Sequence, residues 1–143
     1  MIETAFWDTS ALVPLCIQQQ NSSLAGQLTT QYGIAVWWAA MVEARSAFAR
    51  DLRNGVISNA EHHTAILRVE KMRQNWVEIL PDEPLRLFAE DLPDRFALRA
   101  ADALQLAAAY TWTMQRPAGR PFISGDKRLL DAAGQLGFRT LAV

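Results

Sequence analysis

The chain has few cysteines to cross-link it through disulfides, and few of the glycines and prolines that are abundant in unfolded chains. It contains one cysteine, 7 glycines and 6 prolines in 143 residues, and its net charge at pH 7 is -1. Cys16 has no partner for an internal disulfide, and we expect it in the core because it lies in the apolar stretch ALVPLCI. Half of the residues are apolar, which excludes intrinsic disorder and predicts a single domain over 1–143.

Long hydrophobic runs are also missing. The longest one, GIAVWWAAMV at 33–42, ends at Glu43 and is shorter than the roughly 20 residues that span a bilayer. The N-terminal MIETAFWD lacks both the basic and the apolar region of a signal peptide. Together with the single cysteine, these absences predict a cytoplasmic protein in a reducing compartment, without a membrane partner.

The charges are unevenly distributed along the chain. Six basic residues and three acidic ones lie between Arg45 and Arg73, whereas five acids and one arginine lie between Asp82 and Asp94. Arginine supplies 12 of the 14 basic side chains, and its guanidinium suits bidentate contacts with phosphate. A polyanion is therefore a candidate partner of the middle region, although charge alone favours an ordinary solvated helix face.

Segments typical of strands alternate with segments typical of helices. We expect strands over 3–8, 33–38, 77–80, 122–126 and 138–143, and helices over 11–20, 22–32, 39–55, 58–76, 84–92, 99–112 and 127–137. Strands separated by helices imply parallel crossovers. The sequence thus predicts an α/β/α sandwich around a central, mostly parallel sheet of about five strands.

Several helix ends carry local signals. Thr9 and Ser10 are predicted N-caps of the first helix, and Ser58 with Glu61 forms a capping box at the start of another. Pro93 is expected to break the helix over 84–92, because proline lacks an N–H and clashes with the preceding turn.

Four carboxylates interrupt stretches that are otherwise apolar or small: Asp8, Glu43, Asp102 and Asp126. Asp8 and Asp126 end predicted strands, and Glu43 follows a strand by about one helical turn. In a parallel sheet such positions share the carboxyl edge, where α/β proteins bind ligands, and Asp102 can join them from the start of its helix. Each residue alone also has an ordinary explanation as a cap, a turn residue or an ion-pair partner, such as Arg99 for Asp102.

A site that brings these acids together must either protonate some of them or bind a cation. Two carboxylates about 4 Å apart repel each other by about 4 kcal/mol at an effective dielectric constant of 20. No cluster of histidine and cysteine accompanies them, since His62 and His63 are neighbours that we expect at the surface. Oxygen ligands alone favour Mg²⁺ or Mn²⁺ over zinc.

The sequence resembles the PIN-domain ribonucleases, and among them the VapC-type toxins of bacterial toxin–antitoxin pairs. Four segments carry the resemblance, in family order across nearly the whole chain: FWDTSALVPL, AAMVEARSAFAR, LRAADALQLAAAY and FISGDKRLLDAAGQLGFRTLAV. The resemblance implies a PIN-like α/β/α fold and metal-dependent cleavage of RNA by an endoribonuclease. It assigns the acidic quartet to Asp8, Glu43, Asp102 and Asp126, and matches the family's hydroxyl residues with Thr9, Ser10 and Ser124.

This chain departs from the family pattern at a few places. Gln105 stands where a histidine is common, Pro14 where a lysine is frequent, and Ala40 where a serine or threonine is often found. The loop at 115–121 also looks longer than usual. None of these differences removes a carboxylate, so the expected activity is unchanged. The choice of substrate stays open.

From these residues we predict hydrolysis of an RNA phosphodiester. Asp8 and Asp102 are expected to ligate the cation directly, with Glu43 and Asp126 acting through water or on a second ion. The hydroxyls of Thr9, Ser10 and Ser124 either orient these ligands or serve as caps. Candidate phosphate anchors are Arg45, Arg50, Arg53 and Arg128. Trp7 and either Trp37 or Trp38 are expected in the core rather than as stacking platforms.

Other functions stay open at this stage. A haloacid-dehalogenase-like phosphatase usually needs a second acid two residues after the first, where this chain has Ser10. A PIN-fold module that binds RNA or protein without catalysis would keep the fold and lose the metal. The resemblance further implies an antitoxin partner and homodimers, for which exposed-looking hydrophobic residues offer contacts: Trp76, Leu87, Phe88 and Trp112.

Overall fold

The computed structural model describes residues 2–143, which form five strands and seven helices. The strands are β1 (Glu3–Trp7), β2 (Tyr32–Trp37), β3 (Val77–Ile79), β4 (Pro121–Ser124) and β5 (Arg139–Ala142). The helices are α1 (Thr9–Cys16), α2 (Ser22–Thr29), α3 (Ala40–Arg53), α4 (Asn59–Arg73), α5 (Glu83–Phe96), α6 (Ala100–Trp112) and α7 (Lys127–Leu136). The predicted alternation is confirmed.

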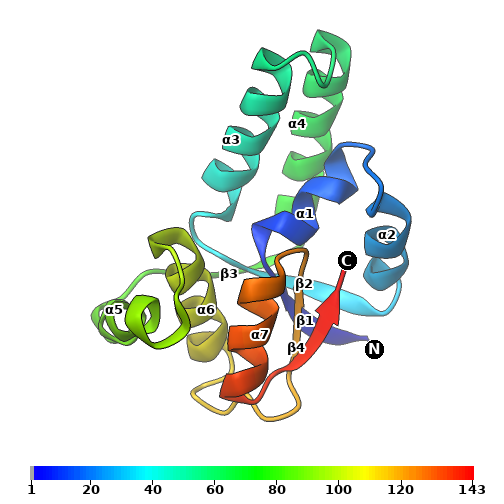
Figure 1. Cartoon of the computed structure of the whole chain (residues 1–143). Coiled ribbons are helices and arrows are strands. Elements are labelled where there is room, and N and C mark those ends of the chain that lie inside the picture. Colours follow the sequence, from blue (N-terminus) through cyan, green and yellow to red (C-terminus); the bar gives the residue numbers. More distant parts are fainter. Residues whose placement is uncertain (1) are drawn as a thin grey trace.

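The strands form one parallel sheet in the order β3-β2-β1-β4-β5. From the central strand β1 the chain builds outward through β2 and β3, and then crosses back to add β4 and β5 on the other side (Figure 1). The strand order therefore reverses at the carboxyl ends of β1 and β4. Such a switch point is the usual ligand-binding crevice of an open α/β sheet.

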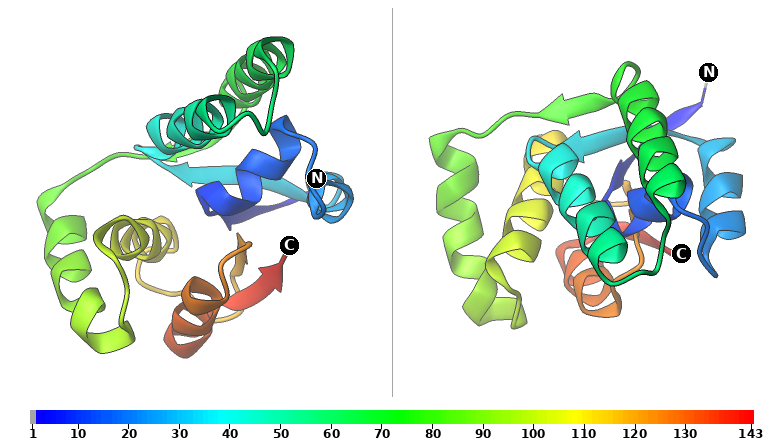
Figure 2. Two further views of the ribbon diagram at one scale, coloured as in Figure 1. Left: turned by 45° about the horizontal axis from the view of Figure 1, so that its top comes forward. Right: turned by 90° about the horizontal axis from the view of Figure 1, so that it is seen from above.

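The alternation of side chains along the strands divides the core into two layers. Phe6, Trp37 and Phe122 pack against α5, α6 and α7, and the rings of Phe6 and Phe122 lie 5.7 Å apart between centroids. Trp7 and Ile123 point to the other face, toward α1 and α2. The three layers predicted from the sequence are confirmed (Figure 2).

Helices α3 and α4 form an arm that extends beyond the carboxyl edge of the sheet (Figures 1 and 2). Phe48 of α3 and Val69 of α4 are fully buried, and they pack with Cys16 of α1 in a third hydrophobic cluster. The predicted core position of Cys16 is thus confirmed. Because α1 follows β1 directly, this packing sets the arm beside the switch point.

Two local predictions are wrong. Helix α1 begins at Thr9 with Asp8 as N-cap, and the Thr9 and Ser10 hydroxyls bond to Glu43 and Asp8 instead of capping the helix. Pro93 does not break α5, which runs on to Phe96 and ends where Ala97 adopts a left-handed conformation with φ 55°. A proline deletes only one backbone hydrogen bond of a helix, and here helix packing outweighs that loss.

The predicted capping box is confirmed. Ser58 and Glu61 form the predicted capping box, with bonds of 2.9 and 3.1 Å between side chain and backbone. Gly55 follows the end of α3 with φ 71°, a conformation that glycine adopts without strain. Within residues 2–143, no helix is both long and apolar enough to cross a bilayer.

Candidate active site

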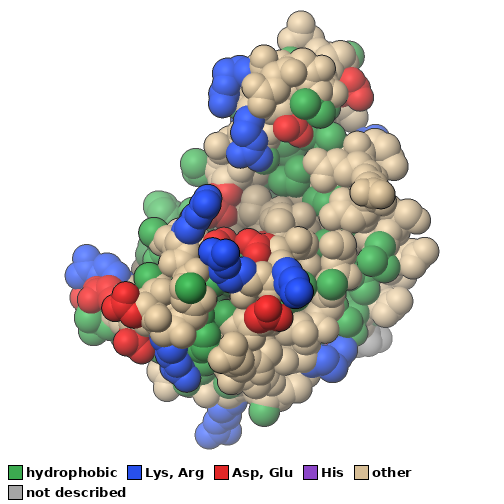
Figure 3. Space-filling view, viewed as in Figure 1, with side chains coloured by type: hydrophobic (Ala, Val, Ile, Leu, Met, Phe, Trp, Pro, Cys, Tyr) green, Lys and Arg blue, Asp and Glu red, His purple; other side chains and the backbone are tan. Residues whose placement is uncertain are grey.

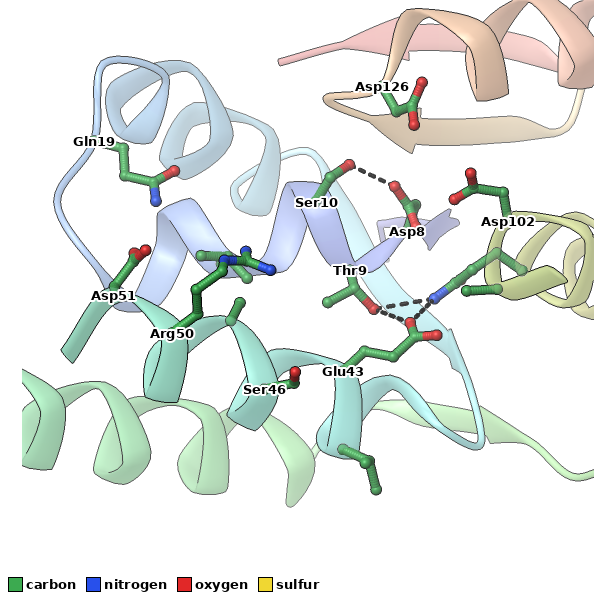
Figure 4. Close-up of a pocket in the computed structure, with 15 residues that line it drawn as sticks. Asp8, Thr9, Ser10, Gln19, Glu43, Ser46, Arg50, Asp51, Asp102 and Asp126 are labelled. Carbon is green, nitrogen blue, oxygen red and sulfur yellow. Dashed lines mark hydrogen bonds between the residues drawn. The ribbon is translucent and has the colours of Figure 1, made fainter. Parts of the chain in front are cut away.

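All four predicted carboxylates line one cavity of about 620 Å³ at the carboxyl edge of the sheet (Figure 4). Asp8 follows β1, and Asp126 follows β4 as the N-cap of α7. Glu43 and Asp102 lie in the first turns of α3 and α6. Each side chain therefore comes from a different crossover, and only the parallel order of the strands brings the four together.

Asp8 is the most deeply placed of the four, with 5% of its surface exposed. The hydroxyls of Ser10 and Ser124 both donate to its Oδ2, the latter over 2.9 Å. Each serine oxygen in turn accepts a backbone N–H, from Gly125 at 2.8 Å and from Asp126 at 2.9 Å. This chain of hydrogen bonds ties the β4–α7 loop to α1 and holds Asp8 in one orientation.

Glu43 is held by a second group of residues. Thr9 Oγ1 donates to Glu43 Oε1 over 2.7 Å, and Gln105 Nε2 donates to the same oxygen over 2.6 Å. Gln105 Nε2 also lies 3.0 Å from Thr9 Oγ1, which closes a triangle between α1, α3 and α6. Gln105 is only 1% exposed, and its Oε1 has no hydrogen-bond partner among residues 2–143.

The sequence assigned no role to Gln105, although a signal was present. Between Ala100 and Ala109 the only polar side chains are Asp102 and Gln105, three residues apart and so on one side of α6. A buried amide with an unpaired oxygen costs about 1–3 kcal/mol. The contact of Gln105 with Glu43 is a specific reason to keep that amide in the core.

Two of the acidic residues, Asp8 and Asp102, have a raised pKa. Burial raises the pKa of Asp8, the hydroxyls of Ser10 and Ser124 partly oppose this, and the charge of Glu43 adds to it. The pKa of Asp102 is raised by burial and then by the charges of Asp8 and Asp126. A negative field of this kind favours either a proton or a bound cation.

The donor set fits a hard divalent cation. The four acidic residues offer only carboxylate oxygens, which suit Mg²⁺ or Mn²⁺. Within residues 2–143, no three or more His, Cys, Asp or Glu side chains converge closely enough to form a complete ligand group. Mg²⁺ keeps several water molecules and needs only one or two direct carboxylates, so a cavity lined by separate carboxylates is compatible with it.

Of the four predicted phosphate anchors, Arg50 lines the cavity. It follows Glu43 by seven residues and thus lies on the same face of α3. Arg45 follows Glu43 by two residues, which turns it about 200° away around the helix, and neither it nor Arg53 is part of the lining. Arg128 bonds to the carbonyl of Ala97 over 3.4 Å.

Basic side chains nevertheless surround the acidic hollow. The charges of Arg128 and Arg99 act on Asp102 and lower its pKa, against the effect of burial. Figure 3 shows Lys and Arg side chains bordering the acidic side chains between the α3–α4 arm and α7. A polyanion that enters the hollow therefore meets positive charge at its rim.

The cavity continues away from the acids along α3. This part is lined by Gln19 from the α1–α2 loop and by Ser46, Arg50 and Asp51 from α3 (Figure 4). Of these four, the sequence had indicated only Arg50. Gln19 lies in a run of three glutamines that carries no pattern, so only the folded chain shows that it faces α3.

The aromatic residues mostly belong to the core. Trp7 and Trp37 are buried as predicted, while Trp38 is 53% exposed. Among the hydrophobic residues expected at the surface, Leu87 is exposed, whereas three others pack in part against the core clusters: Trp76, Phe88 and Trp112.

Comparison with known proteins identifies the fold. No family model matches the chain, and no curated protein matches its sequence. Three solved structures are similar in fold: PAE2754 from Pyrobaculum aerophilum (TM-score 0.66, 18% identity, covering 98% of this chain and 90% of that one), a toxin–antitoxin complex from Klebsiella pneumoniae (0.62, 15%, 86% and 87%) and FitAcB from Neisseria gonorrhoeae (0.65, 15%, 96% and 96%). At these identities the similarity shows a shared fold alone, and it agrees with the predicted α/β/α architecture around a parallel sheet.

Proposed function

We propose that this protein is a Mg²⁺- or Mn²⁺-dependent endoribonuclease that acts as the toxin of a toxin–antitoxin pair. The observation that carries the proposal is the cavity at the switch point, which is lined by four carboxylates from four separate segments. The fold shared with a toxin–antitoxin complex from Klebsiella pneumoniae supports the biological role.

In this proposal Asp8 and Asp102 hold the cation, and Glu43 and Asp126 bind its water ligands or a second ion. When bound, the cation supplies a water of lowered pKa and offsets negative charge on the reacting phosphate. Ser10 and Ser124 keep the Asp8 carboxylate in place through their bonds to Oδ2.

Thr9 and Gln105 orient Glu43 in the same way, through bonds of 2.7 and 2.6 Å. Partners of this kind fix a ligand before the substrate arrives, so that little reorganisation is needed during the reaction. Arg50 lines the cavity and the charge of Arg128 acts on Asp102, so these two serve as the first anchors for RNA phosphates. Arg45 and Arg53 extend that basic surface along α3.

Cleavage of RNA by the purified protein tests the activity. We expect cleavage with Mg²⁺ or Mn²⁺, none with EDTA, and little with Ca²⁺, which prefers more ligands at longer distances. Asp8→Asn should remove cleavage, whereas Asp91→Asn, at an exposed position of α5, should leave it unchanged. Wild-type rates in Asp8→Asn, or equal rates with Ca²⁺ and Mg²⁺, would contradict the assignment.

A catalytically silent RNA- or protein-binding module is distinguished by its response to the cation. A cation that binds only the native state raises its apparent stability. We expect Mg²⁺ or Mn²⁺ to raise the unfolding temperature of the wild type and to leave that of Asp8→Asn unchanged. No cation effect on either protein would favour the silent module.

The proposed partner is an antitoxin, and the proposed compartment is the cytoplasm. The simplest inhibitor is a tail, disordered when free, that places an arginine or lysine among the acidic residues in place of the cation. Expression of the protein alone should stop growth, and co-expression of a small protein encoded next to it should restore growth. Size-exclusion chromatography of the purified protein tests the proposed homodimer. Harmless expression of an active nuclease would overturn the toxin role.

A further inference from the structure

The part of the cavity away from the acids has properties of its own. We call it the distal end and define it by Gln19, Ser46, Arg50 and Asp51. None of these four side chains forms a hydrogen bond or an ion pair with another residue of the described range 2–143. Four polar side chains thus line one concave surface with their hydrogen-bonding groups available.

The fold uses the backbone of these residues rather than their side chains. The carbonyl of Asp51 accepts the N–H groups of Val56 and Ile57, which closes the turn after α3. The N–H of Gln19 donates to Ser22 Oγ over 2.7 Å, and the carbonyl of Gln19 accepts the N–H of Ser22. Local structure therefore explains why the chain turns at both places, but not why a carboxylate and an amide face the cavity there.

The side chains of the distal end occupy different positions along the length of the cavity (Figure 4). The amide of Gln19 and the carboxylate of Asp51 face each other across its far part. Arg50 extends between them and the acidic end, toward α1. A ligand that reaches from the acids to Gln19 therefore passes the guanidinium of Arg50 on its way.

We propose that the distal end binds a guanine base of single-stranded RNA, with Arg50 on a neighbouring phosphate. The inference rests on the proposed ribonuclease function and adds to it the base that the site selects. Single-stranded RNA is read largely through the Watson–Crick edges of unstacked bases. That edge of guanine presents two adjacent donors, N1–H and N2–H, next to the O6 acceptor.

The chemistry of the distal end matches this edge. The carboxylate of Asp51 only accepts hydrogen bonds and has two oxygens for two adjacent donors, while the amide of Gln19 supplies a donor for O6. Uracil, adenine and cytosine each present a single donor on the same edge and leave one carboxylate oxygen without a partner. The whole cavity, with the acidic end included, measures about 620 Å³, which lies within the range of pockets that bind small ligands.

Nucleoside binding tests the inference without any cleavage. The probes are guanosine, adenosine, cytidine and uridine, and binding to the full chain in EDTA is followed by saturation-transfer NMR. We expect guanosine to bind roughly tenfold more tightly than the others, the scale of one bidentate base contact. Asp51→Asn and Gln19→Ala should remove the preference, and Gln20→Ala, a neighbour outside the cavity lining, should keep it.

Cleavage of short RNAs that differ in a single guanine gives the second measurement. We expect wild type to cut next to the guanine, and Asp51→Asn to lose this preference. Equal binding of the four nucleosides, or a preference that survives in Asp51→Asn, would overturn the inference. The same holds if Asp51→Asn weakens only the binding of an arginine-containing peptide, which would assign the distal end to a protein partner.

The two proposals fail in different ways. Guanosine preference in a protein that cuts no RNA would remove the ribonuclease function and leave the base-binding site. Metal-dependent cleavage without guanine preference would remove the base-binding site and leave the ribonuclease.

Discussion

The two ends of the cavity differ in how their side chains are held by hydrogen bonds. At the acidic end, Asp8 and Glu43 each receive hydrogen bonds from two other side chains, and they are supported by residues from three other segments. At the distal end, Arg50 and Asp51 have no such supports in residues 2–143. One end is held in place by the protein, and the other offers its groups to a ligand.

The contrast agrees with the roles proposed for the two ends. Groups that act on a reacting phosphate must already be oriented, because any reorganisation adds to the barrier. Groups that select a base gain from adapting to it, and they act mainly through binding. We therefore expect changes at the acidic end to affect turnover and stability, and changes at the distal end to affect substrate affinity.

The largest expected difference is kinetic. Asp102→Asn should lower kcat for RNA cleavage by at least about a hundredfold, because even partners of metal ligands contribute 10–100-fold. Arg50→Gln should mainly raise KM, by about tenfold, since a phosphate anchor contributes to binding in the ground state as well. Steady-state rates on one RNA at saturating Mg²⁺ measure both. If Arg50→Gln lowered kcat and left KM unchanged, the contrast between the two ends would be lost.

Gln105 gives a sharper test of the acidic end. Gln105→Met keeps the length of the side chain but loses both hydrogen bonds, so Glu43 is held by Thr9 alone. We expect the affinity for Mg²⁺ to fall by about 10–100-fold. The Mg²⁺ concentration that half-maximally raises the unfolding temperature measures it, with the exposed Gln135→Met as the matched control. An unchanged midpoint would show that Gln105 only fills the core.

Ser124 tests the cost of removing a support. Ser124 is fully buried, donates to Asp8 and accepts the N–H of Asp126. Ser124→Ala leaves both groups without this partner, so we expect a loss of about 1–3 kcal/mol in the free energy of unfolding. Chemical denaturation in EDTA measures it. An unchanged free energy of unfolding would mean that the hydrogen bond from Ser124 does not support Asp8.

The pH dependence of stability has a defined sign. The pKa of Asp8 lies above its ordinary value of 3.8 in the folded protein. The native state therefore binds more protons than the unfolded state in that window, and stability falls as the pH rises from 3.8 through the folded pKa. In EDTA, Asp8→Asn should be more stable than wild type at pH 7, and its advantage should shrink toward pH 3.8. Unfolding temperatures across this range measure the difference, and a constant difference would contradict the shift.

The smallest expected effect concerns the distal end. Gln19→Ala and Asp51→Asn should change the free energy of unfolding by no more than about 0.5 kcal/mol, since their side chains carry no bond of the fold. Thermal unfolding in EDTA checks this beside Ser124→Ala. A loss of 2 kcal/mol or more in either variant would show that the distal end supports the fold and is not free for a ligand.

Much of the site follows from local patterns. The alternation of strands and helices and the capping box at Ser58 depend on residues close in sequence, and all of these were predicted. The positions of Asp8 and Asp126 after strands, with parallel crossovers, also predict that they share one edge of the sheet. Propensity was insufficient at Pro93, where the packing of α5 on the core outweighs a missing hydrogen bond.

The sequence by itself determined which elements form, which carboxylates interrupt them and that a parallel sheet would collect them at one edge. The sequence indicated Thr9, Ser10 and Ser124 as residues that either orient those carboxylates or serve as caps. Only the tertiary structure decided which carboxylate each of them contacts, and added Gln105. Ser124 meets Asp8 across 116 residues, and Gln105 meets Glu43 across 62. Periodicity describes neighbours within one turn or one strand, whereas such contacts depend on how separate elements pack. The same reason hid Gln19, which faces Asp51 because α1 packs against the α3–α4 arm.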